Sequence, residues 1–169
     1  MSFLAQLILF TGGHAAGALL FYFFHRVIFH GPLAKYPVFK QWAAIHTRHH
    51  GTPGDPGSFF FPWWANAAIG IFTATVFFLM PAFSLGMVSF FALYAYRHRA
   101  AHNGSTAHWA QHHQSHHFAK PRANFSGSYP FVDKLLGTYV PVDFEVFQAR
   151  AAKARVGNTK QRGKIDSGC

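Results

Sequence analysis

Histidine is concentrated in one stretch of the chain more densely than structural roles require. Residues 98–117 hold seven of the thirteen histidines in the sequence. Neutral imidazole is the commonest metal-ligating side chain, although a single histidine more often serves as a hydrogen-bonded core or surface group. The density and the spacing favour ligation, so the sequence predicts a polyhistidine metal centre.

The histidines form four boxes, Hx4H, HxxHH, HxxxH and HxxHH in chain order. Members three or four residues apart share one face of a helix. Ten ligands are too many for one ion and suit two ions with about five each. Imidazole suits iron, zinc, copper and nickel, so residue type alone leaves the metal open. The predicted ligands are His25, His30, His46, His49, His50, His98, His102, His113, His116 and His117.

The first box has an unusual spacing. His25 and His30 are five residues apart, which places them roughly 140° apart around an ideal α-helix. Gly31 and Pro32 then end the helix. Either two separate metals or a distorted helix end would reconcile this spacing with a shared site.

Three histidines lie outside the boxes. His112 shares an i,i+4 face with His108 and His116, so His112 and His108 are candidates to orient a ligand by hydrogen bonding to it. His113 is preferred over His112 as a ligand because only His113 completes the repeated HxxHH spacing. His14 lies within an apolar segment, where an ionisable residue is a functional candidate, although a hydrogen bond to a neighbouring helix is the commoner role.

The composition indicates a membrane protein. Half of the 169 residues are hydrophobic, 21 are Phe, and the formal net charge is +10. This combination is typical of apolar helices joined to basic cytoplasmic parts. A single cysteine, Cys169, excludes an internal disulfide and cysteine-bound iron–sulfur clusters. With only five carboxylates in the chain, a metal site must use mostly nitrogen ligands.

Three apolar segments are predicted to cross the membrane as helices. Phe3–Phe24 is long enough at about 1.5 Å per residue, and without a basic region before it we interpret it as retained rather than cleaved. Phe59–Met80 and Ala82–Tyr96 form a helical hairpin around Pro81. The return helix is expected to continue beyond the bilayer through the HRAAH segment.

The positive charges predict the topology. All fifteen Lys and Arg residues lie in residues 26–48 or 97–164, so the positive-inside rule places both histidine-bearing regions in the cytoplasm. We expect an all-α integral membrane protein with about three transmembrane helices and a cytoplasmic histidine-rich helical cap. Residues 1–155 would form one domain. Residues 118–142 read as loop, 144–155 as a short amphipathic helix, and 156–169 as a basic disordered tail.

The boxes, in this order, resemble those of the fatty acid hydroxylase and sterol desaturase superfamily of integral-membrane di-iron enzymes. HTRHHGTPGDPGSFFFP is similar to the family's HxxHHxxPxD stretch, and HHQSHHFA and FVDKLLGT are similar to its HHxxHHF and WDxxFGT segments. The likeness covers residues 25–141. The HxxxH box, with Tyr94 four residues before it, resembles that of fatty acid 2-hydroxylases, whereas β-carotene hydroxylases carry a longer Hx4H there.

This resemblance implies O2-dependent insertion of a hydroxyl group into a fatty acyl chain of a membrane lipid. Two iron ions would be held by the ten box histidines, with O2 as co-substrate, Tyr94 beside the ligands, and no further catalytic residue. The chain has no flavin, haem or iron–sulfur signature, so electrons would come from a ferredoxin or cytochrome b5 type of protein. The basic cytoplasmic face could dock such an acidic carrier. No feature points to nucleic acid.

Two alternatives remain open. A carotenoid or sterol oxidase, or a desaturase, could use the same centre, and hydroxylation would differ from desaturation by adding an oxygen rather than removing two hydrogens. The second alternative is a membrane metal-binding or transport protein without catalysis. The apolar segments contain only His14 as an ionisable residue, which argues against an ion path through them.

Overall fold

Helices are the only regular secondary structure in the part of the chain that the structure describes. The computed structural model covers residues 1–53, 63–127, 129–141, 143 and 145, and no strand occurs among them, which confirms the all-α class. The elements are α1 (Phe3–Phe23), the π-helix η1 (Phe24–Phe29), the 3-10 helix η2 (Pro32–Lys35), α2 (Pro37–Gly51), α3 (Trp63–Leu79), α4 (Pro81–His102), α5 (His108–Phe118) and α6 (Pro130–Leu135).

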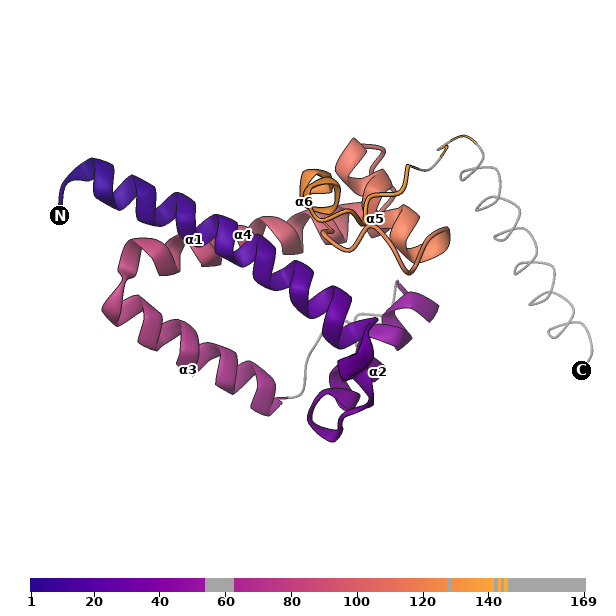
Figure 1. Cartoon of the computed structure of the whole chain (residues 1–169), viewed down its shortest axis with the longest axis horizontal. Coiled ribbons are helices and arrows are strands. Elements are labelled where there is room, and N and C mark those ends of the chain that lie inside the picture. Colours follow the sequence, from indigo (N-terminus) through magenta and orange to yellow (C-terminus); the bar gives the residue numbers. More distant parts are fainter. Residues whose placement is uncertain (54–62, 128, 142, 144, 146–169) are drawn as a thin grey trace, which may run out of the picture.

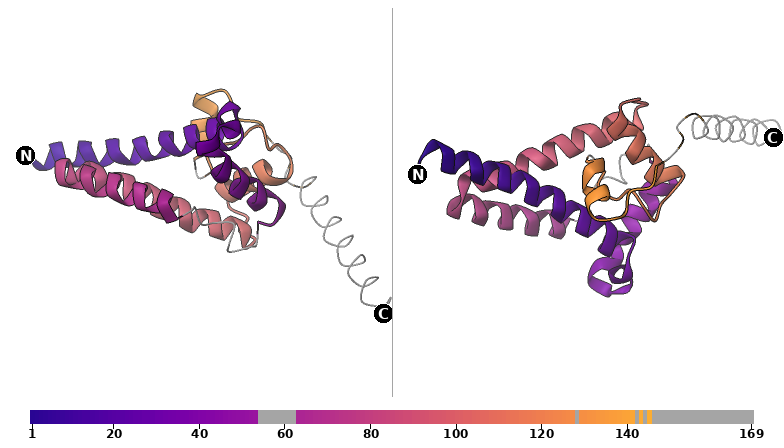
Figure 2. Two further views of the ribbon diagram at one scale, coloured as in Figure 1. Left: turned by 90° about the horizontal axis from the view of Figure 1, so that it is seen from below. Right: turned by 45° about the horizontal axis from the view of Figure 1, so that its top comes forward.

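The long helices α1, α3 and α4 run side by side, and the shorter elements gather at one end of them (Figure 1). Two further views show the same division, with the N-terminus at the end away from the short helices (Figure 2). We use "the cap" for the described residues of 24–53 and 97–141. Because α4 is one continuous helix from Pro81 to His102, it carries its last turns, with two histidines, into the cap.

The long helices begin at residues suited to a helix start. The Ser2 hydroxyl accepts a hydrogen bond from the amide of Ala5 at 3.3 Å and caps α1. Pro81 is the first residue of α4, a position where its missing N–H costs nothing and its fixed φ favours the helix. Pro81 thereby sets the reversal between α3 and α4, as the sequence predicts.

Two glycines let α1 and α4 approach closely. A Cβ atom added at Gly13 would overlap the carbonyl oxygen of Phe83, and one added at Gly86 would overlap that of Phe10. Gly17 lies against the Phe90 ring in the same way, since a Cβ added there would be 3.1 Å from the ring. Small residues at such crossings allow backbone-to-backbone packing of membrane helices. This contact fixes where α4 delivers its histidines relative to η1.

The surface of the long helices is apolar, unlike that of a water-soluble protein. Large apolar side chains on them are exposed, including Phe78 at 85% and Ile71 at 70%. Such an exterior suits helices surrounded by lipid. The cap differs, because its most buried residues include the polar His116 and Asp133, both at 0% exposure. Among the described residues one helix, Phe3–Phe29, is long and apolar enough to span a membrane, and Ala67–Leu79 is a shorter apolar helix.

The predicted loop over residues 118–142 is wrong in one part. Residues Pro130–Leu135 form α6, which starts with Pro130 at its first position. This helix has only six residues, and the apolar and turn-forming residues around it favour the prediction of a loop. The predicted helix at 144–155, apart from residue 145, and the predicted disordered tail at 156–169 lie outside the described residues.

The close crossing of α1 and α4 predicts different effects for two neighbouring glycines. Gly13→Ala should lower the free energy of unfolding by about 1–3 kcal/mol, because the added methyl group meets backbone that cannot move independently. Gly12→Ala meets no atom within 4 Å and should leave stability unchanged or raise it by up to about 1 kcal/mol. Thermal unfolding in detergent measures both, and equal effects would contradict this packing.

Candidate metal centre

A π-helical turn brings the first two histidines to one side of the chain. In η1 the backbone hydrogen bonds close from residue i to i+5, and the His30 amide donates to the His25 carbonyl at 3.1 Å. A π turn holds more residues than an α turn, so positions five apart come nearly into line. Gly31 follows because a Cβ there would overlap the carbonyl oxygens of Arg26 and Val27. Of the two explanations that the sequence allows, the structure has the distorted helix end.

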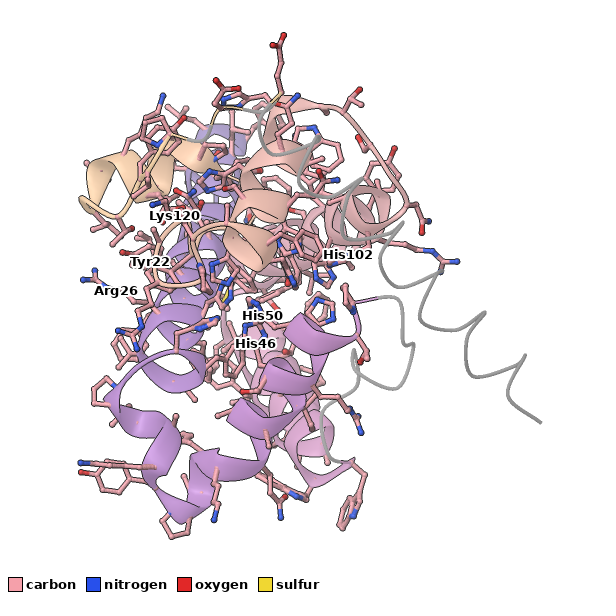
Figure 3. The ribbon with its side chains drawn as sticks, turned by 90° about the vertical axis from the view of Figure 1, so that its right-hand side faces the viewer. Tyr22, Arg26, His46, His50, His102 and Lys120 are labelled. Carbon is pink, nitrogen blue, oxygen red and sulfur yellow. The ribbon has the colours of Figure 1, made fainter. Side chains whose placement is uncertain are left out.

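Ten histidines gather in two groups of five, and they are the ten of the sequence boxes. Within each group the ligand atoms all lie within 4.8 Å of one another. Figure 3 shows His46 and His50 directed from α2 into the middle of the cap. Group one consists of His25, His30, His46, His50 and His116, and group two consists of His49, His98, His102, His113 and His117.

Each HxxHH box serves both groups. On α2, His46 and His50 are one turn apart and belong to group one, whereas His49 between them belongs to group two. On α5 the arrangement is reversed, since the pair one turn apart belongs to group two and His116 belongs to group one. His49 and His116 thus cross from their own box to the other group. The two groups adjoin, and the rings of His50 and His117 stack with centroids 4.2 Å apart.

The ring nitrogens of group one are too crowded to be explained by hydrogen bonds. The Nε2 atom of His46 lies 3.0 Å from that of His25, 2.8 Å from that of His30 and 3.0 Å from that of His50. A ring nitrogen of neutral imidazole carries either one proton or one lone pair, so it forms one hydrogen bond rather than three. A metal ion in the middle of the group, bound by each of these nitrogens, would account for the convergence.

Group two has the same crowding around His102, whose Nε2 atom lies 3.1–3.2 Å from those of His49, His98 and His113. Two nitrogen ligands at about 2.1 Å from one ion, and at right angles around it, are about 3.0 Å apart. The observed separations in both groups match this value. The donor atoms are all imidazole nitrogens, a set that suits iron, zinc, copper or nickel rather than calcium or magnesium.

Burial keeps the grouped rings neutral. It is the main cause that lowers the pKa of His49 to about 3, with the charges of His102 and His50 adding to it. Burial likewise lowers the pKa of His102 to about 4 and that of His116 to about 3. A metal-binding imidazole must be neutral, so at neutral pH no proton has to leave these rings before an ion binds.

Backbone carbonyls fix the ring orientation of two ligand candidates in group one. The Nδ1 atom of His25 donates to the carbonyl oxygen of Phe125 at 2.5 Å, and that of His116 donates to the carbonyl oxygen of Ala123 at 2.7 Å. With the proton on Nδ1, the Nε2 lone pair is free and points into the group. Hydrogen bonds of this kind set the tautomer of metal-binding histidines and increase their basicity.

His112 and Tyr94, both predicted to support ligands, lie beside the groups in different ways. His112 is buried, and its Nε2 atom is 2.9 Å from Asp133 Oδ2 and 3.2 Å from Ser126 Oγ. These hydrogen bonds connect His112 to Asp133 and to the buried segment 123–126 behind group one, rather than to a grouped histidine. The Tyr94 ring stacks on His98, with centroids 5.3 Å apart and planes at 20°. Tyr94 therefore packs directly against group two.

The other two predicted candidates stand outside both groups. His14 bridges helices, with Nδ1 2.7 Å from Ser89 Oγ and Nε2 2.6 Å from the Tyr129 hydroxyl, which is the commoner role for an intramembrane histidine. His108 is exposed at the first residue of α5.

Sequence reasoning missed Asp133 and Asn124 as residues of the site. Both are almost completely inaccessible, at 0% and 1% exposure, and their side chains hold the segment that carries the Ala123 and Phe125 carbonyls. The only sequence feature that could have singled out Asp133 is that it is one of just five carboxylates in a histidine-rich chain. Asn124 belongs to no spacing pattern that would have singled it out. Both support the histidines through backbone, which box spacing does not reveal.

The comparison with protein families agrees with this geometry. The family model described as fatty acid hydroxylase matches residues 10–138, well over half of the chain. The chain belongs to the fatty acid hydroxylase family. Membership indicates an oxidoreductase of the lipid hydroxylase or desaturase kind, in a family of membrane-associated enzymes that use iron. No curated protein and no solved structure matched the chain.

Acidification should destabilise the metal-free protein. Unfolded chains protonate their histidines near pH 6.5, whereas His49, His102 and His116 remain neutral in the fold down to about pH 4 or 3. Between these limits the unfolded state binds more protons, so the free energy of unfolding falls as pH falls. We expect the thermal midpoint, measured in detergent with a chelator, to drop steadily between about pH 7.5 and about pH 4.5. A constant midpoint would contradict the neutral, buried rings.

The crossing of His49 and His116 predicts how pairs of substitutions combine. With one ion in each group, His49→Ala with His117→Ala should remove the ion of group two alone, because both residues belong to it. His49→Ala with His50→Ala should remove both ions, although the two residues are adjacent in one box. Metal content per chain, measured by mass spectrometry on purified protein, distinguishes the pairs. Equal loss in both would contradict the grouping.

Proposed function

We propose that this fatty acid hydroxylase family member is an O2-dependent di-iron lipid hydroxylase that acts on fatty acyl chains at the membrane surface. The observation that carries the proposal is the convergence of ten imidazoles into two adjoining groups at the end of apolar helices. All ten grouped histidines would hold the ions, five in each group. When bound, two iron ions supply the electrons and the Lewis acidity needed to activate O2 and insert a hydroxyl group.

The position of the groups supports a lipid substrate. They lie where α1 and α4 enter the cap, and the exteriors of both helices are apolar. A small gap too tight to hold a water molecule lies beside group two, and it is lined by Tyr94, Arg97, His98, Trp109, His113 and Gly127. An acyl chain from the bilayer would reach the histidines here only by displacing aromatic side chains such as Tyr94 and Trp109. The HxxxH spacing of His98 and His102, with Tyr94, favours the 2-hydroxylase subtype.

The distribution of charge supports a cytoplasmic cap and an acidic electron donor. Asp133 is the one carboxylate among the described residues of the cap, and it is buried, whereas eight basic side chains of these residues are exposed. We propose three membrane crossings, with the cap in the cytoplasm and an external ferredoxin or cytochrome b5 type of protein as donor. The exposed basic residues of the cap are Arg26, Lys35, Lys40, Arg48, Arg99, Lys120, Arg122 and Lys134.

The alternatives differ in their products. A desaturase, or a carotenoid or sterol oxidase, would use the same histidine groups on another substrate or to another outcome. A metal transporter is disfavoured because His14 has both ring nitrogens engaged by Ser89 and Tyr129, which leaves it no free nitrogen for a passing ion.

Lipid analysis of cells supplied with 18O2 tests the proposed function. Cells that produce the wild-type protein should accumulate acyl chains that carry one additional, labelled oxygen. His49→Ala and His116→Ala should each abolish the product, because each removes a ring from a different group. His108→Ala is the matched control, since this histidine is exposed outside both groups, and it should retain the product.

The outcomes separate the candidates. Acyl chains that lack two hydrogens and carry no label would assign desaturation instead. Labelled carotenoid or sterol products would show that the substrate is a carotenoid or a sterol rather than an acyl chain. An unchanged lipid profile in cells that contain metal-loaded protein and an added donor system would overturn the enzymatic proposal and favour a metal-binding role.

A further inference from the structure

A short buried segment behind group one carries the two carbonyl groups that orient its rings. Residues 123–126 are all buried, at 8% exposure or less, although they belong to no helix. Ala123 and Phe125 present their carbonyl oxygens to the Nδ1 atoms of His116 and His25. Irregular backbone has no helical ladder to hold it in place, so something else must fix the direction of these carbonyls.

Asp133 is the main support of this segment. Its Oδ1 atom accepts from the Phe125 amide at 2.8 Å and from the Thr138 hydroxyl at 2.7 Å. Its Oδ2 atom accepts from the Ser126 amide at 2.8 Å and lies 2.9 Å from His112 Nε2. A carboxylate with no solvent exposure is stable only when it is so fully paired. Burial raises the pKa of Asp133, but these hydrogen bonds outweigh it and hold the pKa below its ordinary value.

Asn124 supports the same segment from the other side. It has a positive φ of 59°, a backbone conformation that asparagine tolerates better than most residues. Its side chain donates to the Val140 carbonyl at 2.9 Å and to Ser115 Oγ at 2.8 Å, and accepts from the Val140 amide at 2.9 Å. The turn at Asn124 lets the carbonyls on either side of it face two different histidines.

The support from this segment does not extend to two rings of group two. The buried Nδ1 atom of His113 and both ring nitrogens of His117 have no hydrogen-bond partner among the described residues. The Ala123 and Phe125 carbonyls therefore orient rings of group one and neither of these two rings.

We propose that Asp133 is a positioning residue that preorganises group one for its metal ion. It fixes the Phe125 carbonyl that orients His25 directly, through the Ser126 amide. It fixes the Ala123 carbonyl that orients His116 through Thr138, whose hydroxyl donates to Asp133 and whose carbonyl accepts from the Asn124 amide at 3.0 Å. The inference rests on the metal binding of the proposed function. It makes the metal affinity of group one depend on a carboxylate that belongs to neither group.

Titration of metal-free protein in detergent with Co²⁺, followed by calorimetry and visible absorption, tests this role. Asp133→Asn keeps the shape of the side chain but puts an NH2 group in place of one acceptor oxygen. This NH2 group cannot accept hydrogen bonds, so two of the four groups that donate to Asp133 would lose their acceptor. We expect it to weaken one of the two Co²⁺ equivalents by about 10- to 100-fold and to leave the other unchanged. Asp143→Asn, the same change at an exposed carboxylate, should alter neither equivalent.

Ligand variants identify the affected site. With group two disabled by His113→Ala and His117→Ala, Asp133→Asn should weaken the remaining equivalent. With group one disabled by His46→Ala and His50→Ala, Asp133→Asn should have no effect. A general loss of stability would lower both affinities alike, so selectivity for group one is the readout that a purely structural role does not produce.

A milder variant covers the case in which Asp133→Asn fails to fold. Thr138→Val removes one hydrogen bond to Asp133 without changing charge, and it should weaken the same equivalent to a smaller extent. Equal weakening of both equivalents, or of neither, would overturn the positioning role while leaving the metal centre intact. Failure of the wild-type protein to bind Co²⁺ would instead overturn the metal centre itself.

Discussion

The structure depends on holding two groups of five imidazole nitrogens within 4.8 Å of one another, with several pairs near 3 Å. Lone pairs held this close repel one another, and no pattern of hydrogen bonds among the rings can satisfy an atom such as His46 Nε2, which has three neighbours. The rest of the fold supplies the restraint. The glycine-mediated crossing of α1 and α4, the π turn of η1 and the buried segment behind group one each hold rings where they would not stay unaided.

The two ends of the molecule have interiors and surfaces that suit different surroundings. Along α1, α3 and α4 the apolar side chains face outward and small residues face inward, so packing there depends on close backbone contact rather than on a hydrophobic core. In the cap the interior is polar, and its stability depends on complete pairing of groups such as Asp133 and Asn124. The grouped histidines lie at the junction of these two parts, where the long helices meet the cap.

Much of the candidate site could be predicted from the sequence, because helix geometry fixes which residue spacings place ligands on one face. The ten box histidines, the long α4 and the reversal at Pro81 follow from periodicity and turn residues. The division of the ten rings between the two groups could not be predicted, since it depends on how α2 and α5 face each other across the cap. Asp133 acts through backbone carbonyls eight or more residues away, and the π turn and α6 are decided by tertiary packing that outweighs local preference.

The exchange of His49 and His116 between boxes makes both groups depend on the same pair of helices. Because α2 and α5 each contribute to both groups, neither group can be assembled by one of these two helices alone. A sliding or rotation of α2 against α5 would therefore disturb the ligand atoms of both groups at once. The relative placement of these two short helices is thus the alignment that the rest of the cap has to preserve.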